Sequence, residues 1–340
     1  MKNIALVGIG FMGGMHAQVY QQLANAKLTA VVELDTSRAK TNLEKLGLKL
    51  PIYPNLEKLL SKEAVDVVDV CVPTDLHAQN AILAMNAKKH VFCEKPFALT
   101  VEEGKKILEA QKKDGVHLMV GHCLRFWPEY QALTDFVKSK KAGKLLTFAL
   151  QRRSARPIAS SDNWMNNPKR AIGAALDLHI HDTDFIHHLL GQPKAVTSSG
   201  THDFSGWSHI MTQYHFDDIA VIAEGSWNYP PKWGFQMAFQ VVFERGTVEY
   251  DSRAKPTLVV TLDDQETRPL PFVEPKTGKS VSGQGNLSAL GGYFNELAYF
   301  IDRLEKNQPI EIANGHQALN SLRTTFSEIL SATEHQTILL

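Results

Sequence analysis

The feature that most constrains this chain is the regular alternation of apolar runs and helix-like segments over residues 1–122. The apolar runs are rich in Val and Ile, which is typical of strands buried on both faces of a sheet. They lie at residues 3–9, 28–34, 65–72, 90–95 and 117–122. The segments between them are helical in pattern, over residues 12–24, 37–46, 77–87 and 101–112. This alternation predicts a doubly wound α/β domain with a parallel sheet.

A glycine-rich turn separates the first predicted strand from the first predicted helix. Gly8, Gly10 and Gly13 stand in the G-x-G-x-x-G spacing, with Phe11 and Met12 inside it. The first glycine permits a tight turn, the second lets the backbone approach a pyrophosphate, and the third allows close packing of helix on strand. The helix N-terminus adds unpaired N–H groups and a favourable dipole. Because the motif lies between strand and helix, we expect these residues to bind a dinucleotide.

An acidic residue at the end of the second predicted strand bears on which dinucleotide binds. Glu33 follows Gly13 by 20 residues, where the ribose hydroxyls would be bound. Its carboxylate would repel a 2′-phosphate, so we expect NAD to be preferred over NADP. Arg38, with Ser37, could instead accommodate that phosphate, and NADP therefore stays open as the alternative.

The pattern changes after Arg125. Period-2 alternation, typical of antiparallel strands, runs through residues 195–270, with helical segments at 128–138, 291–307 and 314–335. We expect a dinucleotide-binding domain at residues 1–122 and an α+β domain at 123–340 with an open, mostly antiparallel sheet. An open sheet with one covered face needs a cover on the other. We therefore expect a homodimer or homotetramer that associates through the uncovered face.

Composition excludes several partners. Lys plus Arg and Asp plus Glu both number 36, so no net positive field attracts nucleic acid or an anionic membrane. No apolar run approaches membrane-spanning length, and the glycine-interrupted N-terminus fits a strand better than a signal peptide. The three cysteines cannot all pair, and we expect reduced thiols in a cytoplasmic protein.

Three further motifs carry a family resemblance. They are "CVPTDLHAQ" with Pro73, Thr74 and His77, "CEKPFAL" with Glu94, Lys95 and Pro96, and "LDLHIHDTD" with Asp177 and His181. With the glycine turn, they resemble the glucose-fructose oxidoreductase / inositol dehydrogenase / MocA (Gfo/Idh/MocA) family over essentially the whole chain. The resemblance implies a Rossmann domain, a second and mostly antiparallel α/β domain, a nicotinamide cofactor, and a sugar- or cyclitol-like substrate.

The resemblance also implies a catalytic group of Lys95, Asp177 and His181. The chemistry of these residues agrees with it. A histidine whose pKa lies near working pH suits removal of a hydroxyl proton while hydride leaves carbon. An aspartate four residues earlier shares its helix face and can orient the imidazole. A lysine at the carboxyl end of a parallel strand can stabilise developing alkoxide charge. We therefore expect an NAD(P)-dependent dehydrogenase of a secondary hydroxyl in a sugar, sugar derivative or inositol.

Other candidates surround this group, each with a structural alternative. The resemblance places a further set of residues beside the cofactor: Pro73, Thr74, His77, Glu94 and Lys95. His77 could equally be a satisfied structural histidine, and Glu94 could mainly position its loop or contact the nicotinamide ribose. Arg125 matches a position that borders the substrate pocket, or forms a salt bridge at the domain hinge. Trp164 is a candidate pocket wall, or an ordinary packed aromatic. The resemblance also suggests a cis peptide before Pro96.

The chain departs from the family pattern at one position, and three other functions are alternatives to the dehydrogenase. The family often has small residues before the catalytic aspartate, whereas this chain has Ile172 ahead of Gly173. A zinc site is one rival, because Asp177, His181, Asp184 and His188 share one helix face, yet no H-E-x-x-H or paired cysteines accompany them. No metal is therefore expected, and His179, His187 and His188 are expected to be scaffold. The other rivals are a non-catalytic NAD- or sugar-sensing regulator and a nucleotide-sugar dehydrogenase.

Overall fold

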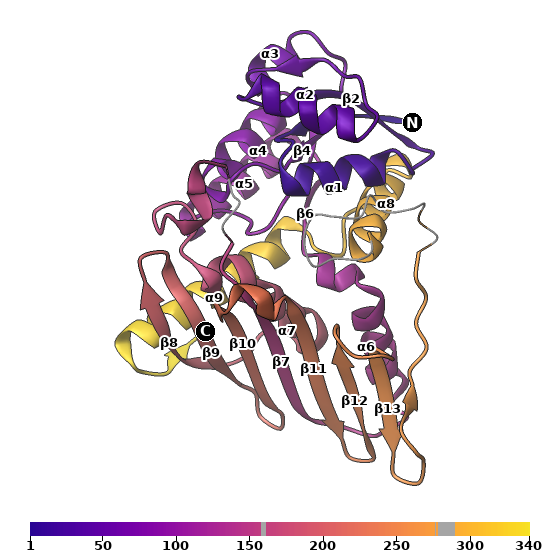
Figure 1. Cartoon of the computed structure of the whole chain (residues 1–340), viewed down its shortest axis with the longest axis vertical. Coiled ribbons are helices and arrows are strands. Elements are labelled where there is room, and N and C mark those ends of the chain that lie inside the picture. Colours follow the sequence, from indigo (N-terminus) through magenta and orange to yellow (C-terminus); the bar gives the residue numbers. More distant parts are fainter. Residues whose placement is uncertain (158–160, 276, 278–289) are drawn as a thin grey trace. The chain divides into compact units, whose positions relative to one another are not determined.

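The computed structural model describes residues 1–157, 161–275, 277 and 290–340 (Figure 1). The chain forms two compact units. Unit 1 comprises residues 1–126 and 275–320, and unit 2 comprises residues 127–274 and 321–340. The sequence predicted two domains that meet at a single boundary after residue 122. Unit 1 also includes residues 275–320, which come from near the C-terminus.

Unit 1 is built on a parallel six-stranded sheet. Its strands lie in the order β3-β2-β1-β4-β5-β6, and every pair is parallel. They are β1 (Lys2–Val7), β2 (Ala26–Val32), β3 (Ile52–Tyr53), β4 (Val67–Val70), β5 (His90–Cys93) and β6 (Leu118–Val120). This is the order of a Rossmann fold, in which ligands bind outside the carboxyl ends of the strands. The predicted doubly wound parallel sheet is confirmed.

Helices connect these strands. They are α1 (Phe11–Tyr20), α2 (Thr36–Lys45), α3 (Leu56–Leu60), α4 (His77–Asn86) and α5 (Val101–Asp114). Local signals set their ends: Thr100 and Glu103 form a capping box before α5, and Gly115 ends it at φ +64°. The first helix ends at Tyr20 and not at residue 24, because the chain must turn before β2 begins at Ala26.

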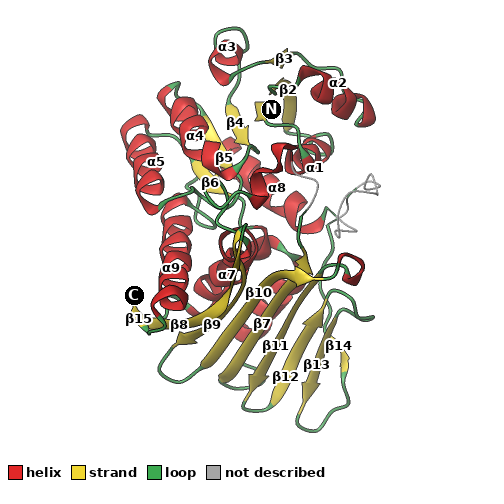
Figure 2. Cartoon of the chain, turned by 60° about the vertical axis from the view of Figure 1, so that its left-hand side comes forward, coloured by secondary structure: helices red, strands yellow, loops and turns green. Residues whose placement is uncertain are grey.

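One helix of unit 1 comes from late in the sequence. Helix α8 (Gly291–Glu305) lies beside α1, as Figures 1 and 2 show. Its Tyr293 ring is 6.4 Å from the ring of His16 on α1, and its Phe300 ring is 5.6 Å from Phe92 on β5. Helix α8 therefore covers part of a sheet whose strands all lie before residue 121 in the sequence.

Unit 2 contains a nine-stranded mixed sheet, seen in Figure 2. The strand order is β14-β13-β12-β11-β7-β10-β9-β8-β15, and only the β7–β10 pair is parallel. The strands are β7 (Leu145–Ala155), β8 (Ala195–Asp203), β9 (Gly206–His215), β10 (Ala220–Tyr229), β11 (Gln236–Phe243), β12 (Gly246–Asp251), β13 (Leu258–Leu262), β14 (Arg268–Pro269) and β15 (Ile338–Leu339). The predicted mostly antiparallel sheet is confirmed.

Helices pack on one face of this sheet. They are α6 (Pro128–Ser139), α7 (Ile180–Leu190) and the part of α9 (Gly315–Glu334) from Ser321 onward. Tyr130 of α6 and Phe185 of α7 make edge contacts with each other and with the sheet residues Phe148 and Phe239. Alternation along the strands leaves the other face partly exposed, with Met211 at 50% and Ile222 at 52% exposure.

Within the described part of the chain, no helix has the length and apolar character needed to cross a membrane. The three cysteines, all of which are described, form no disulfide.

Candidate active site

The glycine turn of unit 1 has the geometry that the motif requires. Gly8 adopts φ +90°, and a Cβ there would lie 2.6 Å from the carbonyl oxygen of Cys71. A Cβ on Gly13 would overlap the carbonyl oxygen of Gly8. Both glycines are therefore required by the turn itself. A Cβ on Gly10 would meet no protein atom within 4 Å, so packing does not explain this glycine, and the approach of a pyrophosphate there stays a prediction.

Glu33 and Arg38, the two residues expected to choose between NAD and NADP, contact each other. Arg38 Nη2 donates to Glu33 Oε1 at 2.7 Å. Glu33 is buried at the end of β2, and the backbone N–H of Asp35 also donates to its carboxylate. The carboxylate is thus fixed where the strand ends, and the guanidinium stands beside it.

The ends of β4 and β5 are joined by His77. Its ring nitrogens lie 2.7 Å from the Pro96 carbonyl oxygen and 2.9 Å from that of Val72. Burial lowers the pKa of His77, which favours the neutral imidazole. Thr74 is buried beside it. Both ring nitrogens of His77 lie against backbone carbonyl oxygens, and a neutral imidazole can donate to only one of them. Its contact with cofactor stays a prediction, like that of Pro73 and Thr74.

Glu94 and Lys95 follow β5 directly. Glu94 is buried, and its Oε2 accepts a hydrogen bond from the backbone N–H of Lys95 at 3.1 Å. Lys95 is half-buried, and the Lys95–Pro96 peptide is cis, as the resemblance implies. The turn is compact and carries the lysine at the edge of the sheet where doubly wound folds bind ligands.

In unit 2, Asp177 and His181 lie at the start of a helical segment that begins abnormally. Residues Ala175–His179 form a π-helix that continues into α7. Single π-helical turns inside α-helices are rare and occur frequently at functional sites. Asp177 and His181 are both half-buried, whereas Asp182 and Asp184, which follow His181, are fully buried. The sequence pattern predicted a regular helix and gave no signal of the π-helical turn.

The backbone before this turn is strained. Ile172 adopts φ +61° and Gly173 φ +85°. The left-handed region is a true outlier for a β-branched residue. A Cβ on Gly173 would lie 2.6 Å from the Trp207 carbonyl oxygen, so this segment rests against the start of β9. The residue that departs from the family pattern is thus also the one in an unfavourable conformation.

The remaining titratable residues of this helix are tied into unit 2. Asp182 accepts two hydrogen bonds from Arg152, and Asp184 accepts one from Ser321 at 2.8 Å. His179 Nε2 lies 3.2 Å from Glu328, and His187 Nε2 lies 3.0 Å from Thr324. Among the described residues, the groups with metal-ligand spacing both lie in unit 1, so the helical set considered as a zinc alternative does not form such a cluster.

The two candidate substrate residues lie in different units. Arg125 is buried in unit 1 and donates to Gln317 at 2.8 Å. Trp164 is half-buried within the 3₁₀ segment Ser161–Asn166 of unit 2. Their contact with substrate stays a prediction.

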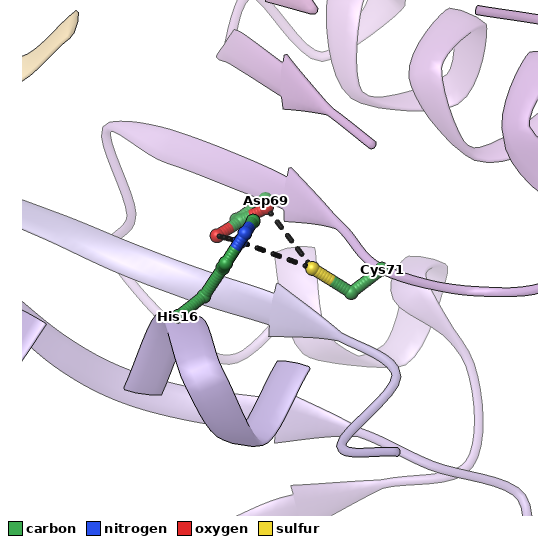
Figure 3. Close-up of side chains that lie close together, drawn as sticks. All are labelled: His16, Asp69 and Cys71. Carbon is green, nitrogen blue, oxygen red and sulfur yellow. Dashed lines mark hydrogen bonds and ion pairs between the residues drawn. The ribbon is translucent and has the colours of Figure 1, made fainter. Parts of the chain in front are cut away.

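A buried polar cluster in unit 1 was not anticipated from the sequence (Figure 3). His16 Nδ1 lies 2.9 Å from Asp69 and 3.2 Å from the Cys71 sulfur, while its Nε2 lies 3.1 Å from Glu94. A third acidic side chain of this cluster, Glu296, comes from α8. One signal was present: Asp69 interrupts an otherwise apolar central strand, and buried carboxylates need partners.

Comparison with known proteins agrees with this geometry. Residues 2–122 match the oxidoreductase family with an NAD-binding Rossmann fold, and residues 130–249 match the GFO/IDH/MocA C-terminal domain. A myo-inositol 2-dehydrogenase of Thermotoga maritima is 30% identical, and the match covers 93% of each chain. A 2,7-anhydro-N-acetylneuraminate hydratase of Escherichia coli is 34% identical over 59% of this chain, which spans 53% of that relative's length.

Solved structures show the same fold. A levoglucosan dehydrogenase in complex with NADH and levoglucosan superposes with a TM-score of 0.86 over 99% of both chains, at 20% identity. The glycine turn, the two folds and these matches lead to one conclusion: the chain belongs to the Gfo/Idh/MocA family of oxidoreductases, with an NAD-binding Rossmann domain followed by the family's C-terminal domain.

Proposed function

We propose that this protein is an NAD(P)-dependent dehydrogenase that transfers a hydride between the nicotinamide and a secondary hydroxyl or ketone of a sugar, sugar derivative or inositol. The observation that carries the proposal is the presence of all three residues of the family's catalytic group, Lys95, Asp177 and His181, in a chain of this family. A regulator that only senses NAD or sugar would not need them. The inositol and sugar dehydrogenases among its relatives support the substrate class.

In this mechanism His181 would accept the proton of the substrate hydroxyl, and a bound nicotinamide would supply the acceptor for the hydride of the carbon that bears that hydroxyl. Asp177 orients the imidazole and stabilises its charged form. The Lys95 ammonium hydrogen-bonds the substrate oxygen and stabilises the alkoxide charge that develops on it. Arg125 and Trp164 contribute to the substrate pocket.

The cofactor residues follow from the Rossmann fold. The glycine turn, with Phe11 and Met12, holds the pyrophosphate, and Glu33 holds the ribose hydroxyls. NAD is preferred because the Arg38 guanidinium is already paired with Glu33, which leaves a carboxylate where NADP carries a phosphate. Pro73, Thr74, His77 and Glu94 complete the nicotinamide side.

We also propose that the protein is a homodimer or homotetramer associated through the outer face of the nine-stranded sheet. Met211 and Ile222, both half-exposed, stand at diagonal positions on the adjacent strands β9 and β10. A monomeric mass in sedimentation or light scattering would contradict this proposal.

A substrate panel tests the function. Inositols, aldoses, anhydrosugars and nucleotide sugars are offered with NAD and with NADP separately, and NADH formation is followed by absorbance. We expect turnover with a free polyol or sugar and a preference for NAD. Turnover only with a nucleotide sugar would replace the substrate class, and tight NAD binding without any turnover would favour the regulator.

One relative suggests an addition to this panel. Because a relative at 34% identity is a hydratase, each mixture is also examined by NMR for products that form without net NADH. Such a product would show that the bound cofactor is regenerated within each turnover.

A further inference from the structure

His16 of α1 is fully buried and has a carboxylate at each ring nitrogen. Nδ1 lies 2.9 Å from Asp69 Oδ2 in hydrogen-bond geometry. Nε2 lies 3.1 Å from Glu94 Oε1, an ion-pair distance at an angle outside hydrogen-bond geometry. A neutral imidazole has one N–H and can serve only one of these carboxylates, whereas an imidazolium serves both. A buried carboxylate without a partner is costly, so the arrangement favours the charged ring.

The other groups around the ring agree with this charge state. Tyr20 donates to Asp69 at 2.9 Å, and the Cys71 thiol also contacts Asp69. Burial opposes a charge on His16, but Asp69 and Cys71 raise its pKa well above the ordinary value. Burial, with Glu94 as the next cause, raises the pKa of Glu296, which favours the neutral form of this carboxyl. The cluster thus holds one cation between two carboxylates.

Glu94 connects this cluster to the turn that carries Lys95. Its Oε2 accepts the backbone N–H of Lys95, while its Oε1 faces His16. A Cβ on Gly121 would lie 2.9 Å from Glu94 Oε1, so the glycine leaves the space that the carboxylate fills. A displaced Glu94 would therefore release the backbone of Lys95.

We propose that His16 is a buried imidazolium at neutral pH and a positioning residue, whose ion pair with Glu94 fixes the main chain of Lys95. His16 acts through Glu94 on the catalytic lysine. The importance of this for turnover rests on the proposed function, while the ion pair itself does not.

A divalent cation is the competing explanation. Ligand atoms of His16, Glu94 and Glu296 lie within 4.8 Å of one another, and Asp69 could orient the ring from its other nitrogen. A cation bound there would replace the proton on Nε2. The two explanations predict different protonation states of the ring.

Ring-nitrogen NMR of the full-length protein with NAD decides between them. Histidine is labelled with ¹⁵N, and the His16→Gln variant assigns the signal. We expect both ring nitrogens of His16 to be protonated at pH 7.5, where ordinary histidines are neutral. A neutral ring, or a stoichiometric metal ion that elemental analysis finds in the purified protein and that His16→Gln removes, would overturn the proposal.

Two substitutions in one cluster test the positioning role. His16→Gln removes the cation beside Glu94, whereas Tyr20→Phe removes a hydrogen bond to Asp69 and leaves Glu94 untouched. We expect the NMR chemical shift of the Lys95 backbone amide to change in His16→Gln and to stay at its native value in Tyr20→Phe. For the best substrate, His16→Gln should lower kcat by about tenfold to a hundredfold with little change in the KM for NAD, because Lys95 is misplaced.

The matched double variant adds a rescue. In His16→Gln/Glu94→Gln the unpaired carboxylate is gone, so the Lys95 amide shift should move back toward the native value. Equal losses in His16→Gln and Tyr20→Phe, or an unchanged Lys95 amide in His16→Gln, would show a merely structural role. If no substrate is turned over, the proposed function fails, while the ring and amide measurements still decide the role of His16.

Discussion

Two fully buried histidines, one in each unit, show how similar side chains can serve different purposes. His16 in unit 1 stands between Asp69 of β4 and Glu94 beyond β5. In unit 2, His179 Nε2 lies 3.2 Å from one carboxylate, that of Glu328, and 3.1 Å from the hydroxyl of Tyr214. Glu94 belongs to the turn that carries Lys95, while Glu328 belongs to a scaffold helix.

The two glutamates differ in the second group that each one contacts. Glu328 also accepts from Thr183 at 3.0 Å, so it ties the helix after the π-helical turn to α9. His179 packs tightly on the sheet, because a Cβ added to Gly225 of β10 would lie 2.6 Å from the Cβ of His179. His179 therefore contacts the carboxylate that ties α7 to α9, and its role is structural. His16 contacts the carboxylate that holds the backbone of Lys95, and we infer that it positions this residue.

The largest expected effect concerns the proposed catalytic residues of the two units. Lys95→Ala and His181→Ala should each lower turnover by about 10²–10⁴-fold, because a proton acceptor or an alkoxide-stabilising cation is lost. NAD affinity, measured by calorimetry, should stay nearly unchanged. His188→Ala, on the same helix, is the control and should keep its turnover. Unchanged turnover in either catalytic variant would refute the assigned role.

The next effect tests whether the unit 2 network is structural. Asp182→Ala leaves the Arg152 guanidinium buried without its carboxylate and should lower the free energy of unfolding by about 3–5 kcal/mol. Urea denaturation measures the loss. The double variant Arg152→Met/Asp182→Leu, which removes both charges, should recover most of it. A double variant as unstable as Asp182→Ala would show that packing, and not charge, is responsible.

A smaller effect bears directly on His179. Glu328→Gln weakens the contacts to His179 and Thr183 and should cost about 1–2 kcal/mol of stability. Turnover below the melting temperature should remain native. A loss of kcat in Glu328→Gln without a loss of stability would erase the distinction between the two histidines.

The two units should also respond to opposite ends of the pH scale. Because the folded pKa of His16 is raised, its contribution is complete below the unfolded value of 6.5 and is lost as pH rises through the folded pKa. In unit 2, hydrogen bonds from His209 and Arg153 lower the pKa of Glu224 to about 2, so its contribution is lost as pH falls toward that value.

Hydrogen exchange measured across pH separates these responses. Unit 1 strands should lose protection at alkaline pH, and unit 2 strands at acid pH. His16→Gln should flatten the alkaline loss, and Glu224→Gln the acid loss. An alkaline loss that persists in His16→Gln would assign it to another group.

The smallest effect concerns backbone strain. Ile172→Gly relieves a left-handed conformation that costs about 1–2 kcal/mol, against about 0.5–1 kcal/mol for the added freedom of glycine in the unfolded chain. We expect a rise in stability of no more than about 1.5 kcal/mol by thermal unfolding. Lys140→Gly, at φ +54° after α6, is the matched control and should gain a similar amount. A marked loss in Ile172→Gly would mean that its side chain matters more for packing than its backbone costs.

Much of the fold could be predicted because its signals are local. The Val- and Ile-rich runs, the glycine spacing and the period-2 pattern each act over a few residues, and both sheets have the predicted character. The π-helical turn could not be predicted in this way. It arises where Ile172 and Gly173 meet the start of β9, a contact between segments more than thirty residues apart.

The candidate site likewise has a part that local sequence signals predict and a part that distant segments assemble. The spacing of Gly8, Gly10 and Gly13 and the position of Glu33 suffice for a nucleotide-binding turn, because strand, turn and helix are consecutive. The His16 cluster is assembled from α1, β4, the turn after β5 and α8, and the single local signal, Asp69 in an apolar strand, does not identify its partners.

By itself, the sequence determined the class of each sheet, the glycine turn and the motifs that place the chain in its family, since these depend on short-range periodicity and backbone freedom. Only the tertiary structure decided that α8 packs with the first unit and that His16 meets two carboxylates. It also decided which acidic and histidine residues around the π-helical turn are buried. These outcomes depend on which distant strands and helices become neighbours, and burial then decides which charges must find partners.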